Sequence, residues 1–137
     1  MKNLSIILLV LSLSMIVGHV HGAGVRIANE LRFKKLLKME CHSKDDKIGP
    51  KILKPGEHFR FLFGADFFGR TRFNCRLSQG PNFRHHQSFV AFKQHVHTDL
   101  GGVWDWRARE DGIYFKKEGG LHIKKPTLMR KEYSWIP

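Results

Sequence analysis

The sequence predicts an all-β fold, a small antiparallel β-sandwich with one intramolecular disulfide. Short runs in which apolar and polar residues alternate recur along the chain, and this is the period of a half-buried strand. Turn residues separate the runs at regular spacing, as in a sandwich of short strands. The two cysteines, Cys41 and Cys75, allow a single connectivity, and we expect the disulfide to tie the two sheets together.

Residues 1–22 have the order of a secretory signal peptide, with a basic start at Lys2, an apolar run over 6–17 and small residues at the end. We expect cleavage after Gly22 or, alternatively, after Ala23. No later run reaches the apolar length of a membrane-spanning helix. The sequence therefore predicts a secreted, extracellular protein in which residues 23–137 form one domain and the cysteine pair is oxidised.

The composition is strongly basic. The formal net charge is +12, and losing Lys2 with the signal peptide leaves +11. A charge of this size favours anionic partners such as anionic polysaccharide, lipid head groups or an acidic receptor surface, although it can equally serve solubility alone. Specific nucleic-acid binding is not predicted, because the phenylalanines alternate too regularly to form a stacking platform for bases.

The first half of the chain opens with a predicted strand at 25–31, where apolar and polar residues alternate. The segment 33–41 is ambiguous, because its apolar residues would line one face of either a helix or a strand. Polar and turn-forming residues at 42–50 predict a loop.

Residues 56–77 predict a β-hairpin whose two faces differ sharply in character. Alternation places an apolar set on one face: Phe59, Phe61, Phe63, Thr71, Phe73, Cys75 and Leu77. The other face carries Arg60, Arg70, Arg72 and Arg76. If the strands pair, these guanidinium groups share one side and form a candidate site for carboxylate, sulfate or phosphate. The alternative is an ordinary solvent face.

In the second half, loops are expected at 78–82 and 95–102, with a short strand at 89–92 between them. Asp111-Gly112 predicts a second hairpin with a type I′ turn, which needs positive φ at both central residues. The expected register pairs Ala108 with Phe115 and Glu110 with Ile113. It places Trp104, Trp106, Ala108, Ile113 and Phe115 on one side, and Arg107 and Arg109 beside the Tyr114 ring on the other. One or two short strands are expected over 121–135.

Taken together in order and spacing, these pieces resemble the plant self-incompatibility protein family, also called S-protein homologues. The residues that carry the resemblance lie at 25–29, at 41–46 with Gly49, at 56–63, at 68–75 and at 106–114. The resemblance implies a small secreted β-sandwich with a Cys41–Cys75 disulfide. It also implies a non-enzymatic ligand for a membrane receptor, the role that family members in pistils play toward pollen. Many members carry a second cysteine pair, which this chain lacks.

No pattern of residues here predicts catalysis, a cofactor or a metal site. His95 and His97 would share a strand face, and Asp45 and Asp46 are adjacent carboxylates, but further ligands do not accompany them. We therefore predict a recognition ligand that a cell-surface receptor contacts through the loops 42–50, 78–87 and 95–102. The alternative is a cationic defence or cell-wall-binding protein, and a more remote one is a secreted ribonuclease. No oligomeric state is predicted.

Overall fold

The computed structural model describes residues 22–64, 71–93, 102–118 and 128–137. The predicted signal peptide lies outside these residues except for Gly22, and its cleavage site stays a prediction. Within the described ranges, no helix has the length and apolar character needed to cross a membrane.

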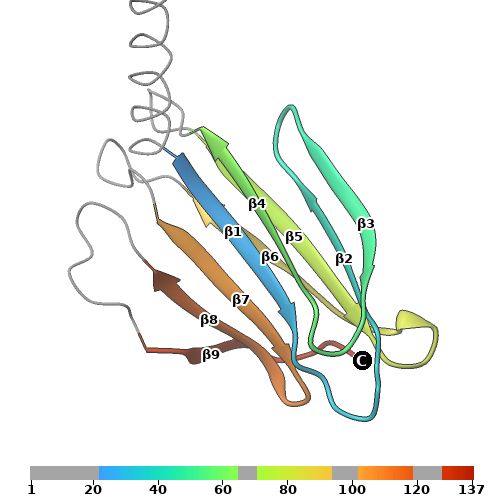
Figure 1. Ribbon diagram of the computed structural model, residues 1–137. Coiled ribbons are helices and arrows are strands. Elements are labelled where there is room, and N and C mark those ends of the chain that lie inside the picture. Colours follow the sequence, from blue (N-terminus) through green and yellow to red (C-terminus); the bar gives the residue numbers. More distant parts are fainter. Residues whose placement is uncertain (1–21, 65–70, 94–101, 119–127) are drawn as a thin grey trace, which may run out of the picture.

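Two β-sheets pack face to face, which confirms the predicted sandwich (Figure 1). The five-stranded sheet contains, in spatial order, β4 (His58–Gly64), β1 (Gly22–Asn29), β7 (Val103–Arg109), β8 (Gly112–Glu118) and β9 (Arg130–Tyr133). The four-stranded sheet contains β3 (Lys47–Leu53), β2 (Leu37–His42), β5 (Arg72–Gln79) and β6 (His85–Lys93), and a short 3₁₀ turn, η1 (Pro81–Phe83), joins β5 to β6. Among the described strands, neighbours are antiparallel except β1 and β7, which run parallel.

The core is built from the side chains that the two sheets turn toward each other. The Phe61 and Phe63 rings of β4 lie with their centroids 5.2 and 4.7 Å from that of Phe73 on β5. The Trp106 ring of β7 donates its indole N–H to the carbonyl oxygen of Ala91 on β6, 2.9 Å away. Aromatic contacts and a buried hydrogen bond thus join the sheets, and the predicted apolar faces are the inner ones.

The disulfide links Cys41 to Cys75, as expected, but it does not tie the two sheets together. The two residues are register partners on the adjacent strands β2 and β5 of the four-stranded sheet, and both are buried. The bond closes a sequence separation of 34 residues, which by the loop-entropy model stabilises the fold by about 4 kcal/mol. It therefore reinforces one sheet, while the aromatic core holds the sandwich together.

The predicted hairpin over 56–77 is wrong in its pairing, although the alternation within each strand is right. β4 pairs with β1, whereas β5 pairs with β2 and β6, so the two strands lie in opposite sheets (Figure 1). Their apolar faces meet across the core instead of lying side by side. Alternation fixes which side of a strand is buried but does not identify its neighbour, and a turn signal fits both arrangements.

Several predicted boundaries also change. The ambiguous segment contains a strand, in which Leu37, Met39 and Cys41 face the core. The predicted loop 42–50 is shorter because β3 begins at Lys47, and the predicted strand 89–92 extends back to His85. The β3 strand escaped prediction because an edge strand with exposed faces carries little apolar periodicity and tolerates Pro50.

The second predicted hairpin exists, with a register shifted by two residues. Ala108 pairs with Ile113, and the turn is Glu110–Asp111 rather than Asp111–Gly112. A shift of two keeps every side chain on its predicted face. Gly112 has a different role from the expected one, because a Cβ there would collide with the carbonyl oxygen of Tyr133 on β9.

The expected stacking of arginine on tyrosine is present, since the Arg109 guanidinium lies 4.5 Å from the centroid of the Tyr114 ring. In the C-terminal region the described strand is β9, and residues 119–127 lie outside the description.

Candidate functional site

The arginines predicted to bind anions lie on two different faces. Arg60 on β4 projects from the outer face of the five-stranded sheet, beside its register partner Arg26 on β1. Arg72 and Arg76 on β5 project from the outer face of the four-stranded sheet, and all three arginines are exposed. Arg70 lies outside the described residues. The structure therefore separates the predicted cluster, and anion binding by either face stays a prediction.

A buried carboxylate, which sequence reasoning missed, organises cations on the outer face of the five-stranded sheet. Asp105 lies between two core tryptophans of β7 and points outward, yet it is 0% exposed. Its Oδ2 lies 3.2 Å from Nη1 of Arg26, 3.3 Å from Nη2 of Arg107 and 3.9 Å from Nζ of Lys116. Arg107 also pairs with Glu30 and Lys116 with Glu118, so Asp105 is the buried centre of an ion-pair network and holds the guanidinium groups in place.

The signal for this cluster is weak in the sequence. Asp105 sits at an alternating polar position like any solvent-facing residue, and Arg26 is 79 positions away along the chain. Only the pairing of β1 with β7 and of β7 with β8 brings Arg26 and Lys116 to the two sides of Asp105.

The connections between strands divide between the two ends of the sandwich. The β2–β3 loop, which contains part of the predicted contact loop 42–50, lies at the end where β6 finishes and β7 begins, and the predicted contact loop 95–102 lies outside the described residues except for Gly102. The third, 78–87, belongs to the opposite end, together with the β1–β2, β3–β4 and β7–β8 connections (Figure 1). The two described contact loops, 42–50 and 78–87, therefore do not form one surface.

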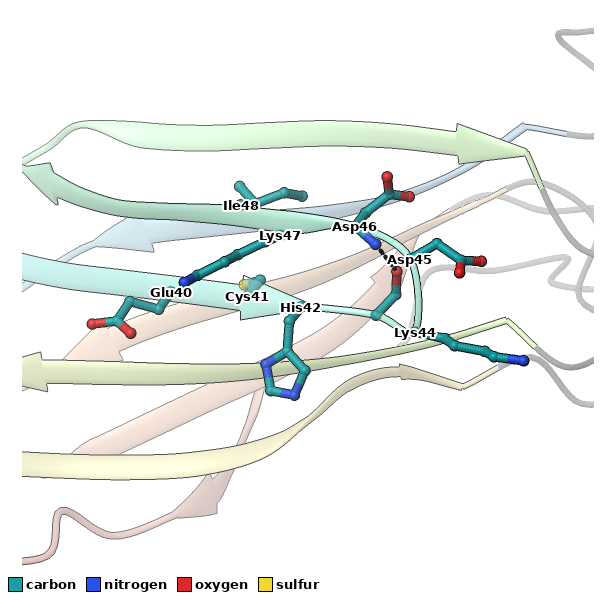
Figure 2. Close-up of a pocket in the computed structure, with 9 residues that line it drawn as sticks. Glu40, Cys41, His42, Lys44, Asp45, Asp46, Lys47 and Ile48 are labelled. Atoms are coloured by element: carbon teal, nitrogen blue, oxygen red, sulfur yellow. Dashed lines mark hydrogen bonds between the residues drawn. The ribbon is translucent and has the colours of Figure 1, made fainter.

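At the first end, the β2–β3 loop borders a hollow of about 320 Å³ formed by residues 40–48 (Figure 2). The backbone N–H of Ser43 donates to the Asp46 carbonyl oxygen at 2.8 Å, and the Asp46 N–H donates to the Ser43 Oγ at 3.1 Å. Figure 2 shows Lys44 and Asp45 extending from the loop tip, away from the strands. A closed turn thus displays two opposite charges to solvent.

A larger hollow of about 700 Å³ adjoins the same loop and reaches Phe63, Arg72 and Asn74. Within the ranges that the structure describes, no three His, Cys, Asp or Glu side chains come together as a metal site would require. His95 and His97 lie outside those ranges. The chemistry available here is that of charged and hydrogen-bonding groups.

The opposite end also carries a polar hollow, of about 600 Å³, lined by Glu30, Arg32, Arg109, Glu110, Asp111 and Tyr114. The Tyr114 hydroxyl donates to Asp111 Oδ2 at 2.6 Å. This hydrogen bond is the main reason why the pKa of the Asp111 carboxyl is lowered and that of the Tyr114 hydroxyl is raised. The Arg109 guanidinium is also held in place, since its Nε donates to Glu30 Oε1 at 2.9 Å.

Comparisons with known proteins agree with this architecture. A family model described as plant self-incompatibility protein S1 matches residues 24–135. S-protein homolog 17 of Arabidopsis thaliana is 60% identical over 136 residues, which are 99% of either chain. S-protein homolog 16 of the same plant is 56% identical over 137 residues, again 99% of both chains.

A solved structure of an SPH (self-incompatibility protein homologue) protein is 25% identical, with a TM-score of 0.66, and the match covers 85% of this chain and 96% of that one. That work describes the SPH proteins as a widespread family of small, highly stable, secreted plant proteins. This confirms the predicted extracellular location, and the family is not a known enzyme family. Because the family model covers residues 24–135 and S-protein homolog 17 matches almost the full length, the chain belongs to the plant self-incompatibility protein family, the S-protein homologues.

Proposed function

We propose that this protein is a secreted, non-enzymatic recognition ligand that a receptor on a neighbouring cell binds through loops of the sandwich. The observation that carries the proposal is the β2–β3 loop, whose charged tip follows β2, the strand that the disulfide ties to β5. Cys41 is 1% exposed and lies two residues before the loop begins, so the base of the loop is fixed in the core. Recognition residues typically sit on loops that a rigid scaffold positions.

The charges at the loop tip suit selective recognition. Lys44 and Asp45 are both exposed, adjacent and opposite in sign. The Ser43–Asp46 hydrogen bonds close the turn beneath them, which limits the conformations that they sample. A fixed pattern of alternating charge discriminates between partners by electrostatic complementarity, whereas a single-sign patch attracts any polyanion.

Exchanging the two charges tests the proposal at constant net charge. The double variant Lys44→Asp/Asp45→Lys should lose saturable binding to cells, because each charge then faces a like charge on the partner. The matched control exchanges Lys131 and Glu132 on β9, a pair of exposed residues outside the loop, and should bind as wild type does. Equal binding of wild type and the loop variant would refute recognition through this loop.

A second candidate function, a cationic defence or cell-wall-binding role, is favoured by the distribution of arginines. Arg60 and Arg76 project from opposite outer faces, so anionic polysaccharide or lipid head groups would meet positive charge on either side. Binding of this kind falls smoothly as ionic strength rises and is insensitive to the exchange of loop charges. The remote ribonuclease alternative predicts turnover of RNA by the purified protein.

A further inference from the structure

The β1–β2 connection holds an exposed aromatic ring in an unfavourable backbone conformation. Phe33 has a φ of 60° and the next residue, Lys34, has a φ of 57°. Left-handed backbone is a genuine outlier for a bulky side chain, and two consecutive residues here adopt it. The Phe33 side chain is nonetheless 84% exposed, so burial of the ring does not compensate for the strain.

Buried polar contacts impose this conformation. Asn29 is 0% exposed; its Oδ1 accepts from the Leu31 N–H at 2.9 Å, and its Nδ2 donates to the carbonyl oxygens of Lys35 and Leu53, each at 2.9 Å. The backbone is therefore hydrogen-bonded to the buried Asn29 side chain on both sides of Phe33, at Leu31 and at Lys35. Backbone strain of this kind persists where the surroundings over-determine it, and such sites are enriched in binding function.

Glu110 of the β7–β8 turn forms a second set of contacts with this loop, the Glu110 clamp. The Glu110 carboxylate accepts from the Arg32 backbone N–H at 2.8 Å through Oε1 and from the Lys35 ammonium at 2.8 Å through Oε2. Two elements that are remote in sequence thus hold the residues flanking Phe33. The backbone that presents the ring is therefore fixed before binding, which lowers the entropic cost of engaging a partner.

The ring is flanked by cationic residues and by one partly exposed apolar side chain. Arg32 and Lys34 flank Phe33 in the chain and are exposed, and Leu36 is 43% exposed. One ring and one half-exposed leucine offer too little apolar area for stable insertion into a membrane. They match the size of an aromatic anchor that fills a pocket at the centre of a protein interface.

We propose that Phe33 is the anchor with which this protein docks into an apolar pocket, rimmed by carboxylates, on its protein receptor. The inference rests on the proposed receptor function and adds a contact at the end opposite the β2–β3 loop. Arg32 and Lys34 supply the charge complementarity toward the acidic rim. No predicted contact loop includes this segment.

The variant Phe33→Gly separates anchoring from folding, because the two effects have opposite signs. Glycine adopts positive φ without strain, so the thermal midpoint should stay equal or rise. Loss of the ring should weaken saturable cell binding by about 30-fold or more, the range of an interface hot spot. Leu62→Ala is the matched control, since Leu62 is 66% exposed on β4, and its binding should equal that of wild type.

Each outcome decides the inference. Saturable wild-type binding that Phe33→Gly leaves unchanged would overturn the anchor and leave the receptor function standing. Absence of saturable wild-type binding would overturn both. A Phe33→Gly protein that melts below wild type, with Phe33→Ala doing the same, would show a structural role for the ring and overturn the anchor. Phe33-dependent binding to phosphatidylserine vesicles free of protein would replace the receptor pocket by a membrane.

Discussion

Replacing Asp105 by asparagine tests whether the buried carboxylate organises the outer face of the five-stranded sheet. The change keeps the size of the side chain and removes its charge. Arg26, Arg107 and Lys116 then lose the carboxylate oxygen that lies 3.2, 3.3 and 3.9 Å from their nitrogen atoms. Glu30 and Glu118 still pair with Arg107 and Lys116, but both carboxylates are partly exposed, so the three cations lose the one buried negative charge that they share.

The structure sets the expected size of this effect. Removing one partner of a buried ion pair destabilises a protein by about 3–5 kcal/mol. The Arg26, Arg107 and Lys116 side chains keep 29%, 23% and 21% of their surface exposed, so water screens part of the repulsion and the lower end applies. We expect a loss of about 3 kcal/mol, which lowers the thermal midpoint of a domain this size by roughly 12 °C.

Thermal unfolding followed by circular dichroism measures the effect, at low and high salt. The deficit of Asp105→Asn should shrink at high salt, because screening weakens the repulsion between the cations. Glu118→Gln is the control, since Glu118 also pairs with Lys116 but is 43% exposed, and its effect should stay below about 1 kcal/mol. An Asp105→Asn protein that melts with wild type would refute the organising role.

Two further predictions concern the scaffold and the clamp. Replacing Cys41 and Cys75 by alanine should lower the free energy of unfolding in urea by about 4 kcal/mol, because the unfolded chain regains the entropy of the open loop; an unchanged midpoint would contradict this. The pKa of Glu110 is lowered, chiefly by the hydrogen bond from Lys35, so its contribution to stability is complete above its ordinary pKa of 4.5 and is lost as the pH falls through the lowered value. The protection factor of the Arg32 amide hydrogen, which is the exchange rate of an unstructured chain at the same pH divided by the observed rate, should therefore fall on acidification in wild type, and Glu110→Gln should flatten this pH dependence; identical protection at every pH in both proteins would contradict the clamp.

Alternation predicts most of the core from the sequence, because the side of a strand that is buried is a local property. Phe61, Phe73 and Trp106 all face inward as expected, and the aromatic pairing of Arg109 with Tyr114 follows from the same period. The disulfide follows from cysteine count alone. Even a register error of two residues in the second hairpin leaves these faces intact.

The neighbours of each strand and the strained backbone could not be predicted from the sequence, since both depend on contacts between distant residues. Arg60 and Arg76 fall on opposite faces because β4 and β5 belong to different sheets, which their own alternation cannot reveal. The burial of Asp105 needs β1 and β8 on either side of β7. The left-handed conformation of Phe33 arises from Asn29 and Glu110, and nothing in the residues around it predicts positive φ.

The most direct test of the receptor proposal is a saturation isotherm of the labelled secreted protein on intact plant cells, measured at two ionic strengths. We expect a saturable component that excess unlabelled protein displaces and that persists at the higher ionic strength, because specific complementarity supplements bulk charge. Binding that rises without saturation and vanishes as salt increases would contradict it, and would leave a cationic protein held by electrostatic attraction alone.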